Sequence, residues 1–292
     1  MRLRSRRVRR RGSRRRRVRA ASFAAVRRLV RSLRPVWRAM LSAPRAMQVI
    51  VAVVILLITS SALNWVYHAI RKPSEVLFPV SDMLAKTPPE TWRQYGPLFK
   101  EYSTAVITPE LLAALAQVEG AGNPLAQTYW RWSPTWNPFQ LYQPASSAVG
   151  MFQLTDGAFR EAKRYCIRDH VVVQDGPWHD VKSCWFNSLY TRVLPSHAIE
   201  LTAASLDRGV SALLQRHHIT VVTLQEKQDL AAVIHLCGSA HADAYAGRRL
   251  KLIPREQCGD HDLRKYLLQV NAVKRHFARL AHAQSLSPIR TH

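Results

Sequence analysis

The strongest constraint in this sequence is an uncharged, strongly apolar stretch that runs from Ala46 to Tyr67. A helix of about 20 apolar residues spans a hydrocarbon core of about 30 Å, and aromatic residues such as Trp65 and Tyr67 favour the membrane interface. We therefore predict a transmembrane anchor over residues 46–67. The alternative is a signal peptide cleaved near Ala62, but the apolar region of such a peptide is usually about 7–15 residues long.

Positive charge is concentrated before this stretch. The 292-residue chain has a formal net charge of +24, and 18 of its 43 Lys and Arg residues precede Ala46, whereas the first acidic residue is Glu75. The positive-inside rule then places residues 1–45 in the cytoplasm and the rest of the chain outside, in the periplasm of a Gram-negative cell. The predicted localisation is the bacterial inner membrane, with a single pass.

Residues 1–45 are predicted to form a basic tail with two parts. The Arg block over residues 1–19 repels itself and buries nothing, so we expect it to be disordered. Apolar residues then recur at helical spacing over residues 20–41, with Arg residues between them, which predicts an amphipathic helix on an anionic lipid surface. Nucleic acid is the less favoured partner, because no aromatic residues interleave the Arg block.

The remainder of the chain is predicted to form one mainly α domain. Prolines limit regular structure over residues 68–88, which are interpreted as a linker, and residues 285–292 form a tail. Residues 89–284 offer ample material for a hydrophobic core. Two short strands, over 139–142 and 149–154, should form a small hairpin. Helical spacing predicts helices near residues 90–102, 109–119, 155–165, 196–216, 226–246 and 260–283.

One predicted helix carries a carboxylate on its apolar face. Thr108 can cap this helix and Pro109 suits its first turn, while the glycines after Glu119 stop it. Leu115 and Leu112 precede Glu119 by four and seven residues, so the three share one face. Loss of water around a carboxyl group raises its pKa, and this keeps a general acid protonated near neutral pH. The alternative is an exposed or ion-paired Glu at the edge of the apolar stripe.

Two short motifs follow this helix in order. Glu119 is followed by Asn123-Pro124, and the run A-V-G-M-F-Q occupies residues 148–153. They resemble the E-S-x-x-N-P and A-x-G-L-M-Q signatures of the soluble lytic transglycosylase-like domain, a relative of goose-type lysozyme. The resemblance covers residues 108–159 and implies a lysozyme-like helical domain. It also implies that Glu119 is the single catalytic acid/base, that Gln153 lies beside the sugar site and that Gly150 allows a close backbone approach.

The chain departs from the family pattern at several positions. Gly120 stands where a Ser usually follows the catalytic Glu, and Ser147 stands where a Gly is usual. The late A-Y-N-A-G motif of the family has its counterpart in residues 234–238, which include His235. These residues contain no tyrosine, so we expect Tyr245 to supply the hydroxyl group of the motif's tyrosine. The predicted substrate-binding residues are Ser147, Gly150, Met151, Gln153, Tyr142, Trp130, His235 and Tyr245.

An aromatic insert separates the two motifs. It contains Trp130, Trp132, Trp136, Phe139 and Tyr142. Aromatic faces stack on the apolar faces of sugar rings, so the insert is interpreted as part of a glycan groove. The alternative is that these rings only hold a long loop to the core.

The four cysteines, Cys166, Cys184, Cys237 and Cys258, all follow the predicted anchor. An oxidising compartment favours disulfides there, and sequence order favours Cys166 with Cys184 and Cys237 with Cys258, among three possible connectivities. A zinc site that uses nearby histidines is the alternative, although no C-x-x-C or H-E-x-x-H spacing supports it. We expect neither a metal nor a cofactor.

The resemblance implies cleavage of the β-1,4 bond between N-acetylmuramic acid and N-acetylglucosamine in peptidoglycan, with a 1,6-anhydro product. A lysozyme-like muramidase, with water as acceptor and an Asp from residues 169–180 as second carboxylate, is the closest alternative. An inactive glycan-binding or scaffold protein of the cell envelope is another. The expected partners are peptidoglycan glycan strands, the anionic lipid surface, and envelope or secretion-machine proteins.

Overall fold

A computed structural model of the chain describes residues 42–71, 82–128, 130–132, 134–135, 142–177, 179–180 and 183–286. The chain divides into two units, Met1–Val66 and Tyr67–His292. Most of the predicted basic tail, including its amphipathic helix, lies outside the described residues. Part of the predicted linker and residues 287–292 of the C-terminal tail lie outside them as well.

The predicted anchor forms one long helix, α2 (Arg45–Arg71). Its large apolar side chains face outward, since Ile50, Leu56 and Ile58 are 62%, 67% and 64% exposed. Among the described residues, this is the one helix that is long and apolar enough to cross a membrane. Its extent includes the uncharged stretch from which the anchor was predicted.

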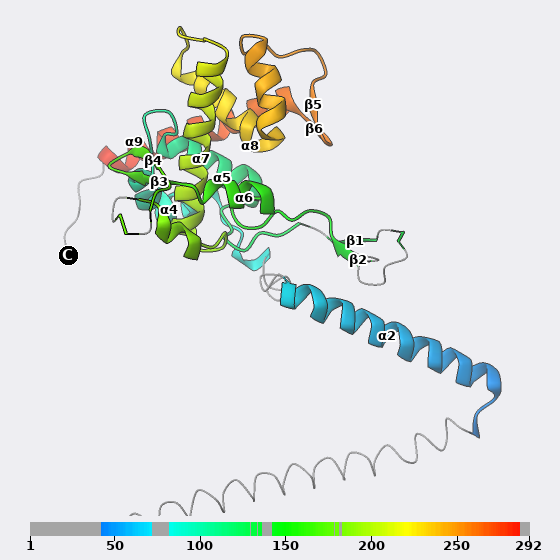
Figure 1. The fold of residues 1–292 in the computed structure, drawn as a ribbon. Coiled ribbons are helices and arrows are strands. Elements are labelled where there is room, and N and C mark those ends of the chain that lie inside the picture. Colours follow the sequence, from blue (N-terminus) through cyan, green and yellow to red (C-terminus); the bar gives the residue numbers. More distant parts are fainter. Residues whose placement is uncertain are drawn as a thin grey trace, which may run out of the picture. The chain divides into compact units, whose positions relative to one another are not determined.

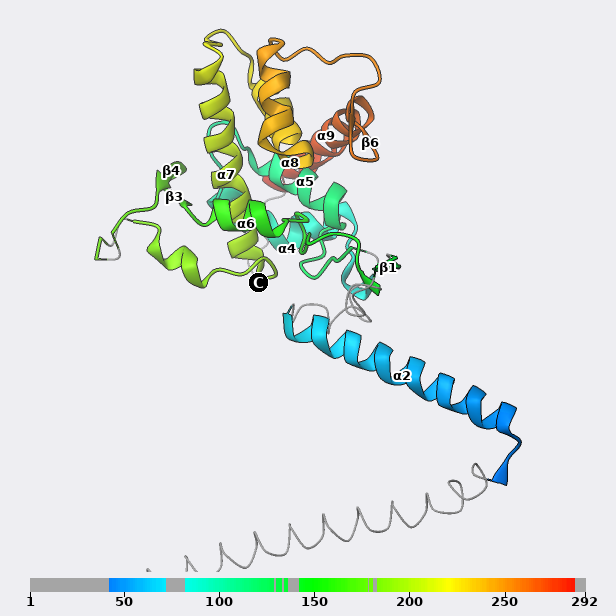
Figure 2. The same cartoon turned by 45° about the vertical axis from the view of Figure 1, so that its right-hand side comes forward.

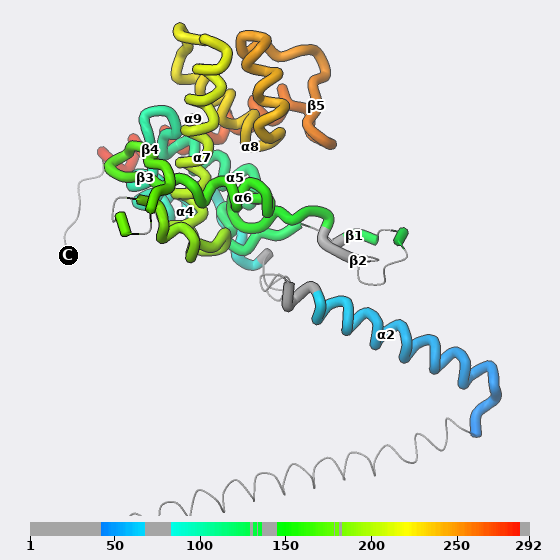
Figure 3. Tube along the Cα trace, in the orientation of Figure 1, coloured from blue at the N-terminus to red at the C-terminus, as the bar shows by residue number. Residues whose placement is uncertain are grey.

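The second unit is mainly helical, as predicted (Figures 1 and 3). Its helical segments are η2 (Asp82–Leu84), α4 (Pro88–Glu101), α5 (Pro109–Gly120), α6 (Asp156–Ala162), η4 (Trp185–Leu189), α7 (Pro195–Arg216), α8 (Leu224–Gly247) and α9 (Leu263–Leu286). Within the described residues, three antiparallel two-stranded sheets join β1 (Trp130–Trp132) to β2 (Tyr142–Pro144), β3 (Tyr165–Arg168) to β4 (Val171–Gln174), and β5 (Gln257–Cys258) to β6 (His261–Asp262). The sheets are therefore small additions to a helical body.

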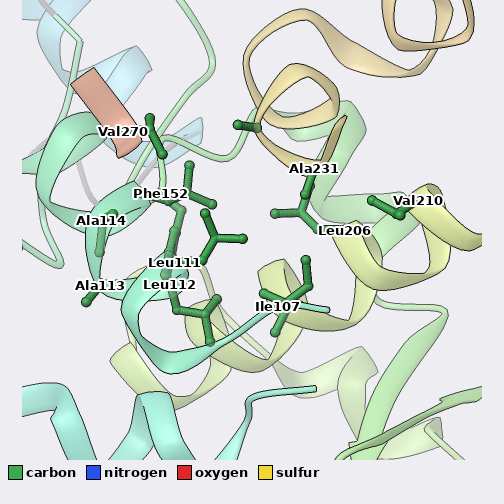
Figure 4. Close-up of a cluster of buried hydrophobic side chains, with 14 of the residues drawn as sticks. Ile107, Leu111, Leu112, Ala113, Ala114, Phe152, Leu206, Val210, Ala231 and Val270 are labelled. Atoms are coloured by element: carbon green, nitrogen blue, oxygen red, sulfur yellow. The ribbon is translucent and has the colours of Figure 1, made fainter. Parts of the chain in front are cut away.

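The hydrophobic core forms around α5. Leu111, Leu112 and Leu115 are fully buried, and burial of such a side chain contributes roughly 1.5–3 kcal/mol. Helix α5 packs against α4 and α9, while α7 packs against α8. Figure 4 shows side chains of α5, α7, α8 and α9 converging with Phe152 on this cluster.

The ends of α5 are as predicted. The hydroxyl oxygen of Thr108 accepts a hydrogen bond from the backbone N–H of Leu111, and such a cap is worth about 1 kcal/mol. At the other end, Ala121 adopts a left-handed conformation with φ 49°, and Gly122 follows with φ 63°. The helix therefore stops one residue after Glu119.

The pairing predicted for the small hairpin is wrong. Strand β2 pairs with β1, which lies upstream, and Trp132 is opposite Tyr142. Residues 149–154 instead close a tight turn, because Gly150 and Gln153 have φ values of 85° and 46° that no strand adopts. In Figure 1 the β1–β2 hairpin extends away from the helical body.

Arg192 fixes this turn to the start of α6. Its Nη1 donates to the carbonyl oxygens of Ser147 and Leu154, each at 2.9 Å, and its Nη2 forms an ion pair with Asp156 at 2.8 Å. A Cβ atom built on Gly150 would lie 2.4 Å from the carbonyl oxygen of Arg192. The close backbone approach expected at Gly150 is therefore present.

Both disulfides follow the pairing predicted from sequence order, with Cys166 bonded to Cys184 and Cys237 bonded to Cys258. The first bridge ties β3 to the residue that precedes η4. The second ties the middle of α8 to β5. The helix predicted over residues 155–165 is shorter than expected, since α6 ends at Ala162, and the strands β3 and β4 that follow it were not predicted.

We expect Gly150→Ala to destabilise the fold by about 1–3 kcal/mol, because its methyl group meets the Arg192 carbonyl and its φ is strained for alanine. The matched control is Gly157→Ala in α6, where nothing lies within 4 Å of the added Cβ. That change should be neutral or slightly stabilising. Urea unfolding measures both variants, and equal losses would contradict the packing described at Gly150.

Candidate active site

Glu119 lies in the last turn of α5, where three helices meet. Helix α9 packs on α5, and α8 packs on α9 (Figure 2). The side chain of Glu119 is 17% exposed. It therefore lies mostly inside the protein while part of it remains open to solvent, as its place on the apolar face predicted.

The phenol of Tyr266 is the closest partner of this carboxylate. Its hydroxyl group donates to Oε1 of Glu119 at 2.5 Å. Tyr266 is only 6% exposed, and burial, with the nearby charge of Glu119, raises its pKa well above the ordinary value. The phenol therefore keeps its proton and acts as a fixed hydrogen-bond donor to Glu119.

A neutral imidazole lies near the same oxygen atom of Glu119. Nε2 of His235 is 3.9 Å from Oε1 of Glu119, and the imidazole is 7% exposed. Burial lowers the pKa of His235, although Glu119 and a hydrogen bond to the Phe152 backbone act in the opposite direction. The described Lys and Arg residues form no ion pair with Glu119. The two described side chains that approach Oε1 of Glu119 are therefore a phenol and a buried imidazole.

The tight turn of residues 149–154 approaches Glu119 through its neighbour. A Cβ atom built on Gly120 would lie 2.9 Å from both the Cα and the carbonyl oxygen of Met151. Met151 and Phe152 are fully buried, so the turn has little room to retreat. This contact explains why the position after Glu119 is a glycine here.

The side chains of Gln153 and Ser147 form hydrogen bonds within this turn region. The amide nitrogen of Gln153 donates to the carbonyl oxygens of Ala126 and Gly150, at 3.0 and 2.9 Å. The hydroxyl oxygen of Ser147 accepts from the backbone N–H of Asp156 at 3.1 Å. These two predicted substrate-binding residues therefore hold the turn beside Glu119 in shape.

The predicted sugar-stacking residues are described in part. Trp130 and Tyr142 occupy β1 and β2, and the structure describes only their backbone, while Trp136 and Phe139 lie outside the described residues. Trp132, between them in the hairpin, is 73% exposed. An exposed indole on a hairpin is available for contact with a ligand.

Tyr245 does not supply the hydroxyl group that contacts Glu119; Tyr266 does so. Tyr245 is 4% exposed in the hydrophobic core, where burial raises its pKa to about 12. Tyr266 was not among the predicted site residues, although the sequence contains a signal for it. Tyr266 shares its helical face with the buried residues Leu263 and Val270, and a buried tyrosine hydroxyl usually needs a partner.

One group of described residues has the spacing of a metal site. The candidate ligand atoms of Cys237, His241 and Cys258 lie within 4.8 Å of one another. Their two sulfur atoms are bonded to each other here, whereas thiolates are the form that binds metal ions. Nε2 of His241 is hydrogen-bonded to the buried carboxylate of Glu256 at 2.8 Å.

We expect His235 to make the folded protein less stable in mild acid. Because its folded-state pKa lies below 6.5, the unfolded chain binds the proton first, so this stability is full above about pH 6.5 and decreases below it. Urea unfolding at about pH 7.5 and about pH 5.5 should show a smaller loss for His235→Gln than for the wild type. His197, whose pKa burial also lowers, is present in both proteins. An equal loss in the two proteins would contradict a buried, neutral His235.

Comparisons with known proteins assign no family to this chain. No protein-family model matches it, and no curated protein matches it. The resemblance over residues 108–159 is therefore a likeness of motifs, and a function has to be argued from the geometry around Glu119.

Proposed function

We propose that this chain is a membrane-anchored lytic transglycosylase of peptidoglycan that uses Glu119 as its single acid/base. The observation that carries the proposal is the contact of Glu119 with a phenol and a neutral imidazole. The carboxyl group is mostly buried and unpaired with any described cation, as a group that must exchange a proton with substrate requires. The motif order around it supports the choice of substrate.

The reaction needs one group that acts twice. Glu119, protonated, donates to the glycosidic oxygen between N-acetylmuramic acid and N-acetylglucosamine, and the bond from that oxygen to C1 breaks. As a carboxylate, Glu119 then takes the proton from the C6 hydroxyl of the muramoyl residue, whose oxygen closes on C1 to give the 1,6-anhydro product. Tyr266 holds Oε1 in place through both steps. Substrate groups stabilise the positive charge, which is a recognised exception to the use of two carboxylates.

The surrounding features supply binding and location in this proposal. The exposed ring of Trp132 on the β1–β2 hairpin stacks on a sugar ring of the glycan strand. Helix α2 anchors the protein in the bacterial inner membrane with its N-terminus in the cytoplasm, because the arginines precede the helix. The catalytic unit is then periplasmic, and the Arg-rich tail lies against anionic lipid, where envelope or secretion-machine proteins are further partners.

We expect Glu119→Gln to lower the release of muropeptides from purified sacculi by about 10²–10⁴-fold, because the amide cannot donate or accept the required proton. The matched control is Glu110→Gln, since Glu110 lies in the first turn of the same helix. It should retain wild-type release. Equal activity of the two variants in the full-length protein would remove Glu119 from the mechanism.

The mass of the released muropeptides identifies the acceptor. A 1,6-anhydro product is lighter by one water than the product of hydrolysis, so mass spectrometry should find the lighter species in the wild-type digest. Finding only the heavier species would replace the proposed reaction by that of a muramidase. Binding of sacculi without any release would indicate a glycan-binding protein instead.

A further inference from the structure

The two partners of Glu119 come from two successive helices. His235 lies on α8 and Tyr266 lies at the beginning of α9. Helix α8 is broken at Gly238, three residues after His235, where φ is 78° and ψ is 176°. Since nothing lies within 4 Å of a Cβ built on Gly238, the glycine serves the backbone conformation. A helix broken there holds His235 less firmly through its own hydrogen bonds.

The Cys237–Cys258 disulfide connects the residue just before this break to the segment that leads into α9. Cys237 is two residues after His235, and Cys258 is eight residues before Tyr266, whereas the backbone between the two partners runs for 31 residues. Cys258 pairs with His261 in the short β5–β6 sheet, which leads directly into α9. The S–S bond is therefore the short covalent route between the imidazole and the phenol that contact Glu119.

A buried carboxylate holds the same connecting segment in place. Glu256 is 6% exposed and accepts hydrogen bonds from His241, from Arg248 and from the backbone of Ile253. Its own carbonyl oxygen accepts from the N–H of Leu263, the first residue of α9. The segment between α8 and α9 is thus fastened on both sides of Cys258, and both the disulfide and the His241–Glu256 hydrogen bond attach it to α8.

The two disulfides of this protein differ in their access to solvent. Cys166 and Cys184 are 3% and 2% exposed, whereas Cys237 and Cys258 are both half-buried. A thiol reductant must approach a sulfur atom directly in order to break the bond. It therefore reaches the bridge beside the candidate active site before it reaches the other.

We infer that the Cys237–Cys258 disulfide positions both partners of Glu119, so that its reduction by a dithiol lowers turnover at this site. This inference rests on the proposed function. In the reduction, the dithiol supplies two electrons and two protons, the S–S bond breaks to give two thiols, and the dithiol closes into a disulfide. Cys237 and Cys258 are positioning residues, because they act through His235 and Tyr266.

Two double variants separate positioning from general stabilisation. The bridges close loops of similar length, with separations of 18 and 21 residues, so their loss should lower thermal stability by similar amounts. We expect Cys237→Ala/Cys258→Ala to lower kcat for sacculus digestion by about 10- to 100-fold with a smaller change in KM, because a shift of about 1 Å in a positioned group costs about 10²-fold. Cys166→Ala/Cys184→Ala should keep near-wild-type kcat.

Two further measurements do not depend on these variants being equally well folded. Dithiothreitol added to the full-length wild type, with a chelator to keep metal from the freed thiols and His241, should lower kcat to the same extent. Nuclear magnetic resonance titration of His235 should show its pKa rising toward the ordinary value once the bridge is lost, as it moves away from its buried position facing Glu119.

Equal losses of kcat in the two double variants would overturn the inference. So would an unchanged kcat together with an unchanged titration of His235 after loss of the Cys237–Cys258 bridge. If the wild type releases no muropeptides, the proposed function fails, and the His235 titration then decides the positioning role alone.

Discussion

The arrangement around Glu119 depends on one hydrogen bond, from the Tyr266 hydroxyl to the carboxylate at 2.5 Å. It joins the end of α5 to the beginning of α9 in a place that excludes most water, where an unpaired polar group would be costly. The phenol satisfies the carboxylate without adding charge, and the neutral His235 adds none either. Glu119 therefore has a fixed hydrogen-bond donor and no ion pair with a described Lys or Arg residue.

The turn region beside this hydrogen bond is held mainly by side chains that donate hydrogen bonds to backbone carbonyl oxygens. Arg192 is bonded to two carbonyl oxygens of the turn region and to Asp156, while the amide of Gln153 is bonded to two others. These bonds fix a turn whose left-handed residues would not keep their conformation unaided. The turn also packs closely on the residue that follows Glu119, because a Cβ atom built on Gly120 would lie 2.9 Å from the backbone of Met151.

The sequence predicted those parts of the fold that local patterns determine. The cap at Thr108, the burial of Leu112 and Leu115 and the side-chain position of Glu119 follow from helical periodicity and from the residues at the helix ends. The pairing of β1 with β2 could not be predicted in the same way, because the register of a hairpin depends on the geometry of its turn as well as on the residues of its strands. Tyr266 is 147 residues away from Glu119, so nothing local indicated that they meet. The break in α8 at Gly238 was likewise hidden, since an isolated glycine is tolerated within a helical pattern.

The missing side chain at Gly120 also limits how this region can be redesigned. A serine placed there, to imitate the motif that this stretch resembles, would collide with the main chain of the neighbouring turn and not merely with a movable side chain. A graft of that kind would have to carry its own replacement for the loop as well. Glu119 and the path of the chain beside it therefore form one transferable module, which protein engineers would need to exchange whole.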